Sequence, residues 1–185
     1  MKWILDPTHA EVEFAVKHLM ISTVKGRFRS FSGTGTTRPD GKLGEVQMTI
    51  DAGSLDTNVI QRDDHLRSAD FFNVADHPQL RFTSTAIKQE GNDVTIIGDL
   101  RMRGVTRPVT LIGEYTAPSA DPWGNPRAAL AVAGVVNRKN WGLNWNMALE
   151  AGGVVVGEDV KLRIEVEATA AQVAEAEVAT ALVHG

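Results

Sequence analysis

The polar residues best suited to chemistry gather in one short stretch, Arg62-Asp63-Asp64-His65. A guanidinium presents a fixed fork of donors that suits an anionic oxygen. One interpretation is structural: Arg62, Asp63 and His65 satisfy one another and the local backbone, because buried charges persist when they are paired. The other is functional: Arg62 and His65 hydrogen-bond the head group of a ligand. The sequence leaves both open.

No other residues have the spacing that metal binding or nucleophilic catalysis requires. The histidines His9, His18, His65 and His77 include no His-x-x-x-His pair, and the chain has no cysteine. We therefore predict no metal site. A Gly-x-Ser-x-Gly elbow is absent, and the glycines around Gly33 match no phosphate-binding loop. We predict no catalytic residue, no cofactor and no enzyme activity.

Composition narrows the class of protein further. The chain has 185 residues, 43% of them hydrophobic, and a formal net charge of -4. This length fits one domain with a substantial core. The negative balance predicts no nucleic-acid partner. No run approaches the roughly 20 apolar residues of a membrane span. The first residues, Met1 to Pro7, lack the apolar stretch of a secretory signal, so we expect a cytoplasmic location.

The elements that must position these residues are strands. Apolar and charged residues alternate over 160–168, and similar alternation is found over 11–18, 45–50 and 94–103. This period of two is typical of a strand with one face on a core and the other in water. Further strands are expected over 22–36, 79–89, 107–117 and 127–138, with turn residues between them. The segment 54–70 lacks alternation and predicts short helical turns, with Thr57 or Asn58 as the N-cap.

About eight long antiparallel strands favour a closed barrel, because closure removes exposed sheet edges. We therefore predict an all-β fold: an extended antiparallel barrel of about eight strands, lipocalin-like, over residues 1–168, with the short helical segment capping one end. An eight-stranded barrel can be filled by its own side chains or hold one small ligand. Residues 169–185 are Ala- and Glu-rich and predict a helix-prone tail, either frayed or docked on the barrel or a partner.

The alternation also predicts which side chains face the interior and contact a ligand. The inward set shares one parity on each strand: Phe14, Val16, Phe28, Met48, Ile50, Phe82, Ile96, Leu100, Leu111, Val132, Leu162 and Ile164. The outward set is charged: Lys17, Lys161, Arg163, Glu165 and Glu167. His18 has the inward parity and is either a buried histidine or a polar anchor for a head group. Phe71, Phe72, Trp141 and Trp145 lie outside the alternation and either belong to the core or close or line the end of a tunnel.

With the strands placed, the intervening motifs resemble the YceI-like family, lipocalin-like proteins associated with polyisoprenoid binding. The resemblance runs from Trp3 to about Ala168 and is carried by several motifs in order. They are Trp3-Ile4-Leu5-Asp6-Pro7-Thr8-His9, Val24-Lys25-Gly26-Arg27-Phe28, Ile50-Asp51-Ala52-Gly53-Ser54-Leu55-Asp56-Thr57, Arg62-Asp63-Asp64-His65-Leu66-Arg67-Ser68-Ala69-Asp70-Phe71-Phe72, and Asn140-Trp141-Gly142-Leu143.

The resemblance implies a barrel with a long apolar tunnel, a polyprenyl or quinone-type lipid as the ligand, and a possible homodimer. Three classes of function are carried forward. The first is a carrier or storage protein for a long-chain isoprenoid lipid, with the head group near Arg62 and His65. The second is an enzyme acting on an isoprenoid substrate, and the third is a packed-core interaction domain with no ligand.

Overall fold

The computed structural model describes residues 1–171, and ten strands account for most of them. The strands are β1 (Lys2–His18), β2 (Ser22–Phe28), β3 (Phe31–Thr37), β4 (Leu43–Asp51), β5 (Leu55–Asp56), β6 (Gln79–Glu90), β7 (Asp93–Met102), β8 (Val105–Ala120), β9 (Pro126–Asn137) and β10 (Val156–Ala170). One α-helix, α1 (Ile60–Arg67), and two short 3₁₀ helices, η1 (Ala52–Ser54) and η2 (Arg138–Trp141), complete the described part of the chain.

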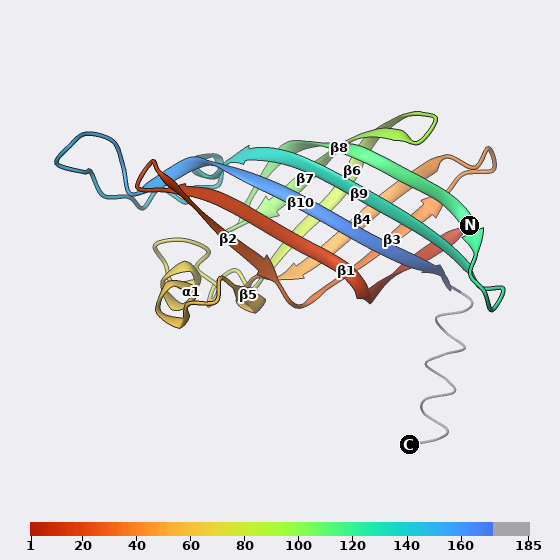
Figure 1. Ribbon diagram of the computed structural model, residues 1–185, viewed down its shortest axis with the longest axis horizontal. Helices are drawn as coiled ribbons and strands as arrows, with labels where there is room; N and C mark the ends of the chain where they lie inside the picture. Colours follow the sequence, from red (N-terminus) through yellow and green to blue (C-terminus); the bar gives the residue numbers. More distant parts are fainter. Residues whose placement is uncertain (172–185) are drawn as a thin grey trace, which may run out of the picture.

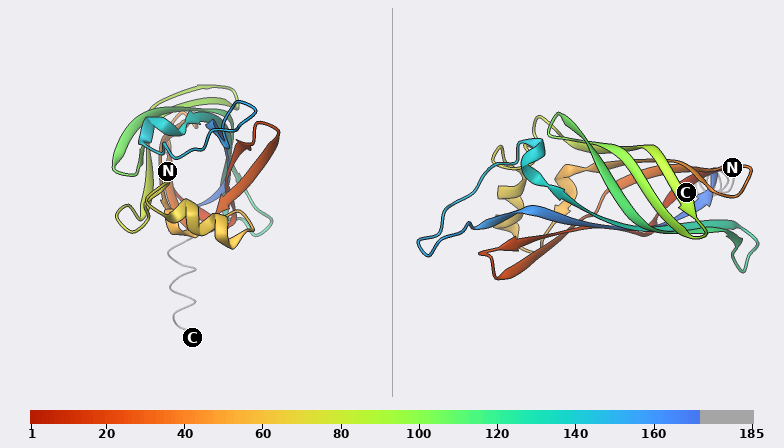
Figure 2. Two further views of the ribbon diagram at one scale, coloured as in Figure 1. Left: turned by 90° about the vertical axis from the view of Figure 1, so that its left-hand side faces the viewer. Right: turned by 90° about the horizontal axis from the view of Figure 1, so that it is seen from above.

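Eight of the strands close into the predicted antiparallel barrel. Around the ring the order is β10-β9-β8-β7-β6-β4-β3-β1, and β1 pairs back onto β10, with Val12 opposite Ile164. Figure 2 shows these strands as a ring seen along the barrel axis. The helix α1 and the N-terminus lie at opposite ends of the barrel (Figure 1). We call these the α1 end and the N-terminal end.

The first strand is longer than its alternation indicated, and it changes partner along its length. Residues Lys2–Ile4 pair with β3, whereas Val12–His18 pair with β2. The single strand expected over 22–36 is therefore two strands, because β2 pairs along β1 while β3 passes between β1 and β4. At the break, the hydroxyl of Ser54 accepts the backbone N–H groups of Arg29 and Ser30.

The predicted inward and outward faces are confirmed along the barrel wall. On β7, Val94, Ile96, Gly98, Leu100 and Met102 are buried, and the residues that alternate with them are half-buried or exposed. On β10 and β1 the charged residues Lys17, Lys161, Arg163 and Glu165 are exposed, and Glu167 is half-buried. The buried side chains form one continuous core inside the ring.

The capping segment is present, but its predicted N-cap is wrong. Both η1 and α1 fall where helical turns were expected, although η1 begins two residues earlier, and α1 lies at one mouth of the barrel (Figure 1). The N-cap residue of α1 is Val59, and no side chain caps the helix. Thr57 has a different partner, because its hydroxyl donates to the carboxylate of Asp63. Asn58 adopts a positive φ of 63°.

The last strand extends beyond the expected boundary at residue 168. Thr169 and Ala170 continue β10, are buried, and pair with Ile4 and Trp3 of β1. The remainder of the predicted helix-prone tail, residues 172–185, lies outside the described residues.

An ion-paired clamp joins β1 to the β8–β9 turn at the N-terminal end. Arg127 lies 2.9 Å from the carboxylate of Asp6 and 3.3 Å from that of Asp121. Burial alone would raise the pKa of the Asp6 carboxyl, but hydrogen bonds from Thr8, His9 and Arg127 hold it well below its usual value. The carboxylate therefore stays charged and fixes the start of a bulge in β1 between Asp6 and Ala10.

A glycine lets one aromatic ring lie flat on the neighbouring strand. Gly26 is the cross-strand partner of Phe14, and a Cβ on Gly26 would lie 2.3 Å from Cζ of that ring. We expect Gly26→Ala to lower the free energy of unfolding by about 1–3 kcal/mol, because the ring must move within a packed core. Urea denaturation measures this. In a Phe14→Leu background the added cost of Gly26→Ala should fall below about 1 kcal/mol. An equal cost in both backgrounds would show that the ring is not the cause.

Candidate ligand-binding cavity

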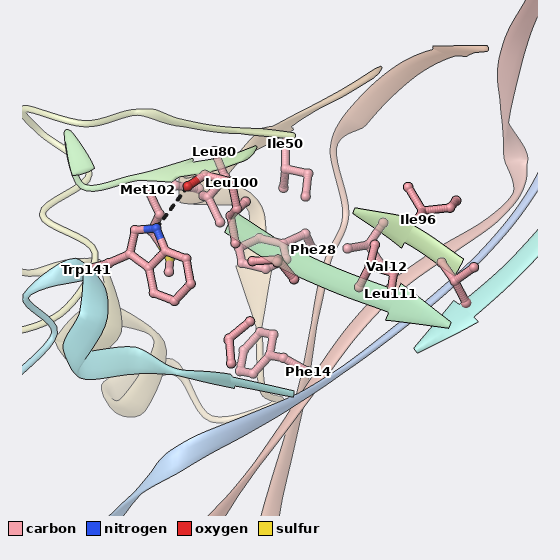
Figure 3. Close-up of a cluster of buried hydrophobic side chains, with 14 of the residues drawn as sticks. Val12, Phe14, Phe28, Ile50, Leu80, Ile96, Leu100, Met102, Leu111 and Trp141 are labelled. Carbon is pink, nitrogen blue, oxygen red and sulfur yellow. Dashed lines mark hydrogen bonds between the residues drawn. The ribbon is translucent and has the colours of Figure 1, made fainter. Parts of the chain in front are cut away.

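A cavity of about 150 Å³ runs inside the barrel. Strands from the whole ring contribute to it, and most of the lining side chains are aliphatic or aromatic. The lining residues are Trp3, Leu5, Val12, Glu13, Phe28, Gly33, Thr34, Gly35, Leu43, Val46, Gln47, Met48, Ile50, Leu80, Phe82, Ile96, Leu100, Val109, Leu111, Tyr115, Ala128, Ala129, Leu130, Val132, Leu162, Ile164, Val166 and Ala168. The close-up in Figure 3 shows Val12, Ile96, Leu111 and Leu100 gathered in this interior.

The polar residues of the lining do not bring charge into the cavity. Glu13 alternates with the buried residues Val12 and Phe14, and its carboxylate meets exposed Arg163 at 3.4 Å on the outer wall. Thr34 and Gln47 are likewise exposed to solvent. No lysine, arginine or histidine is among the lining residues. The interior therefore suits an uncharged, apolar chain.

Ten of the residues predicted to contact a ligand line this cavity. They are Phe28, Met48, Ile50, Phe82, Ile96, Leu100, Leu111, Val132, Leu162 and Ile164. Their contact with a ligand stays a prediction, but the barrel does bring them together. Sequence reasoning missed the residues at the N-terminal end, Trp3, Leu43 and Tyr115 above all. Tyr115 has the same strand parity as Leu111, so the alternation already contained a signal for it.

The other predicted residues lie beyond the cavity, toward the α1 end. Phe14 packs on Phe28 with ring centroids 5.4 Å apart, and Phe72 meets Phe28 edge-on at 5.9 Å. Trp141 is buried, and its indole N–H donates to the carbonyl oxygen of Leu100 at 2.9 Å (Figure 3). Phe14, Phe72 and Trp141 therefore pack as an aromatic layer next to the cavity on its α1 side and do not line it.

A second group of rings links α1 to the segment before β10. His65 lies edge-on to Phe71, with centroids 5.1 Å apart, and to Trp145 at 4.6 Å. Its Nε2 lies 2.9 Å from the carboxylate of Asp70. Val16 and His18, near the end of β1, are half-buried and outside the cavity lining. His65 and His18 thus contact the protein around the mouth and not the cavity itself.

Arg138 holds this end of the molecule in place. Its guanidinium donates to the backbone carbonyls of Leu143, Trp145, Val156 and Gly157, and the residue is only 3% exposed. Burial lowers the pKa of the guanidinium from its usual value. No carboxylate within residues 1–171 forms an ion pair with it. Sequence reasoning missed this role, since no neighbouring residue marks Arg138 as buried.

The Arg62-Asp63 pair has a structural role in the folded chain. Asp63 accepts the Thr57 backbone N–H at 2.9 Å and the Thr57 hydroxyl at 2.6 Å. Arg62 donates to the Thr57 hydroxyl oxygen and to its carbonyl oxygen, at 2.7 and 2.8 Å. Neither residue lines the cavity. A head group held by Arg62 and His65 stays a prediction that these contacts do not support.

We expect Asp63→Ala to lower the free energy of unfolding by about 1–3 kcal/mol, because it leaves the buried N–H of Thr57 without an acceptor. The adjacent Asp64 offers a matched control. It is exposed and, within residues 1–171, pairs only with Arg67 at 3.2 Å, so Asp64→Ala should change stability by less than about 0.5 kcal/mol. Urea denaturation of both variants measures the difference. Equal effects would mean that the buried contacts of Asp63 contribute nothing to stability.

At the N-terminal end, polar side chains meet the cavity. The indole N–H of Trp3 donates to the hydroxyl oxygen of Thr37 at 2.6 Å, and that oxygen lies 2.9 Å from the hydroxyl of Tyr115. Both Trp3 and Tyr115 line the cavity and are 2% exposed. Over the described range, 1–171, no three His, Asp or Glu side chains are grouped as a metal site would need. The same residues contain no helix with the length and apolar character of a membrane span.

In a comparison with known families, residues 3–168 match the YceI-like domain. The chain belongs to the YceI-like family. Protein YceI of Escherichia coli is 40% identical over 160 residues, which cover 86% of this chain and 81% of that protein. The YceI protein of Campylobacter jejuni, whose crystal structure is known, is 26% identical with a TM-score of 0.72, covering 83% of this chain and 89% of that one.

A more distant structure shares the YceI-like fold. It is a polyisoprenoid-binding domain from Saccharophagus degradans implicated in plant cell wall breakdown. The TM-score is 0.64 at 17% identity, and the match covers 91% of this chain and 98% of that domain. At this identity the likeness concerns the fold alone.

Proposed function

We propose that this YceI-like protein binds one long-chain isoprenoid lipid, polyprenyl or quinone-like, inside the barrel and acts as its carrier or store. The observation that carries the proposal is the apolar cavity enclosed by the ring of strands, with no cationic side chain in its lining. The description of the Saccharophagus degradans domain as polyisoprenoid-binding supports the choice of ligand class. The family membership is compatible with a binding protein.

Removal of apolar surface from water supplies the affinity. Each Å² of apolar area buried contributes about 25 cal/mol, so most of the binding free energy comes from the chain of the ligand. The volume of the cavity limits the size of ligand that can enter without movement of side chains. A cavity of about 150 Å³ accommodates a molecule on the scale of benzene, so a long chain must displace side chains. Met48, flexible and half-buried in the lining, is suited to such movement.

A series of prenyl alcohols of increasing length tests the proposal. Native mass spectrometry and competition with a fluorescent prenyl probe would measure the retained lipid and its affinity. We expect affinity to rise with each added isoprene unit until the chain fills the cavity, and then to level off. No retention of any prenyl chain, and no dependence on length, would favour the packed-core interaction domain.

Two of the expectations from sequence remain proposals beside this one. A homodimer, implied by the resemblance, is measured by sedimentation equilibrium of the purified chain. A cytoplasmic location is measured by fractionation of cells that express the full chain. Neither bears on the cavity itself.

A further inference from the structure

Thr37 and Tyr115 form a pair of hydroxyl groups at the N-terminal end. The pair has two hydroxyl protons, and the hydrogen bond between the two groups uses only one of them. The oxygen of Thr37 accepts the indole N–H of Trp3, and a single contact of 2.9 Å joins it to the hydroxyl of Tyr115. Either hydroxyl can donate in that contact, but only one of them does so. Within residues 1–171 the other hydroxyl proton has no acceptor. A donor without an acceptor costs free energy when it is buried.

The position of this donor points to a ligand. Tyr115 lines the cavity and is 2% exposed, so its hydroxyl is held by a residue that borders an otherwise apolar interior. When Thr37 donates to Tyr115, the proton of Tyr115 has no acceptor within residues 1–171 and is available to a ligand that reaches this end of the cavity. A ligand oxygen that accepts this proton selects that arrangement and completes the chain from Trp3 through Thr37 to Tyr115.

Charge decides which oxygen fits. No lining side chain is cationic, and the N-terminal ammonium is exposed and donates to the carbonyl oxygen of Thr37. A phosphate buried here would lose its hydration without a counter-charge, which is far more costly than burying a neutral oxygen. A carbonyl or hydroxyl oxygen needs only one donor.

We propose that the hydroxyl of Tyr115, held by Thr37 and Trp3, binds the neutral oxygen of a prenyl alcohol or prenyl quinone and selects it over a prenyl phosphate. The inference rests on the proposed function, since it requires a prenyl chain inside the barrel. It places the polar head at the end opposite α1, away from Arg62 and His65.

The test compares three probes with one prenyl chain: geranylgeraniol, geranylgeranyl phosphate and the matching hydrocarbon without oxygen. We expect the wild type to bind the alcohol up to about tenfold more tightly than the hydrocarbon, and the phosphate more weakly than the alcohol. Tyr115→Phe should remove the advantage of the alcohol and leave the affinity for the hydrocarbon unchanged. Thr110→Val, which deletes an exposed hydroxyl on the outer wall, is the control and should change neither.

Each outcome separates the two claims. If the hydrocarbon and the alcohol bind the wild type equally, the head-group inference is wrong while the lipid-binding proposal stands. If Arg62→Ala, and not Tyr115→Phe, removes the advantage of the alcohol, the head lies at the α1 end and the inference is also wrong. If no probe binds, the proposed function itself fails. Infrared spectroscopy of a bound prenyl quinone gives a second readout: its carbonyl band should lie at lower frequency in the wild type than in Tyr115→Phe.

Discussion

Replacing Arg138 by methionine should lower the free energy of unfolding by about 3–5 kcal/mol and release the segment between η2 and β10. The guanidinium donates to carbonyl oxygens of Leu143, Trp145, Val156 and Gly157. Hydrogen bonds to a charged group contribute about 1.5–3 kcal/mol each, and they are not additive when they share one group. Methionine retains apolar bulk but removes the guanidinium donors from these carbonyls, of which that of Val156 keeps the side-chain amide of Asn146 as a donor at 2.7 Å.

The consequence extends to the mouth of the barrel, because Trp145 packs on both Phe71 and His65. Hydrogen–deuterium exchange should show faster exchange over residues 142–156 in Arg138→Met, with little change in β7. Lys139→Met is the control. Lys139 is exposed and forms a surface ion pair with Glu158, so its loss should cost less than about 1 kcal/mol. Equal destabilisation by both variants would contradict the anchoring role of Arg138.

Replacing Ile96 by aspartate should abolish retention of a prenyl lipid and lower the free energy of unfolding by about 4 kcal/mol or more. Ile96 is 1% exposed and lines the cavity. The substitution deletes a buried aliphatic side chain and places a carboxylate where no cation can pair with it. Either effect alone is among the largest that one substitution produces.

The next residue along β7 gives a matched control. Ile97 has the opposite parity and does not line the cavity, so Ile97→Asp should fold and retain lipid as the wild type does. Should Ile96→Asp not fold, Ile96→Phe fills the same space at a cost of about 1–3 kcal/mol and should still reduce retention. Circular dichroism reports folding, and native mass spectrometry reports the lipid retained per protein. Equal retention in folded Ile96→Phe and wild type would place the lipid elsewhere.

The alternation of apolar and charged residues predicted the barrel wall, because a strand with one face in water and the other on the core has this pattern. It succeeded on β7, where each buried residue is two positions from the next, and on β10 over residues 160–166, where half-buried and exposed residues alternate. It could not find the break between β2 and β3, because that break depends on which strand each half pairs with. It also missed Trp3, since the charged and turn-forming residues Asp6 to His9 interrupt the pattern that continues from Val12.

The polar features were harder to predict for a physical reason. A sequence shows that Arg62, Asp63 and His65 are close together, but not that Thr57 supplies the partner of Asp63. A sequence indicates even less about Arg138, because its partners are backbone carbonyls. Every residue has such a group, so the partners cannot be recognised from residue types. Tyr115 was also missed, although it is the only tyrosine of the chain and shares the inward parity of Leu111. That parity could have identified its hydroxyl as a polar group beside the apolar interior.

Photolabelling with a prenyl lipid that carries a diazirine along its chain tests the central claim most directly. After irradiation and digestion, mass spectrometry identifies the modified residues. We expect the adducts to fall on inward residues of the wall, such as Met48, Phe82 and Leu162, and to disappear when unlabelled prenyl lipid competes. Adducts confined to exposed apolar residues such as Ile60, Ile112 and Val135 would show that the lipid binds the outer surface, and would contradict a ligand inside the barrel.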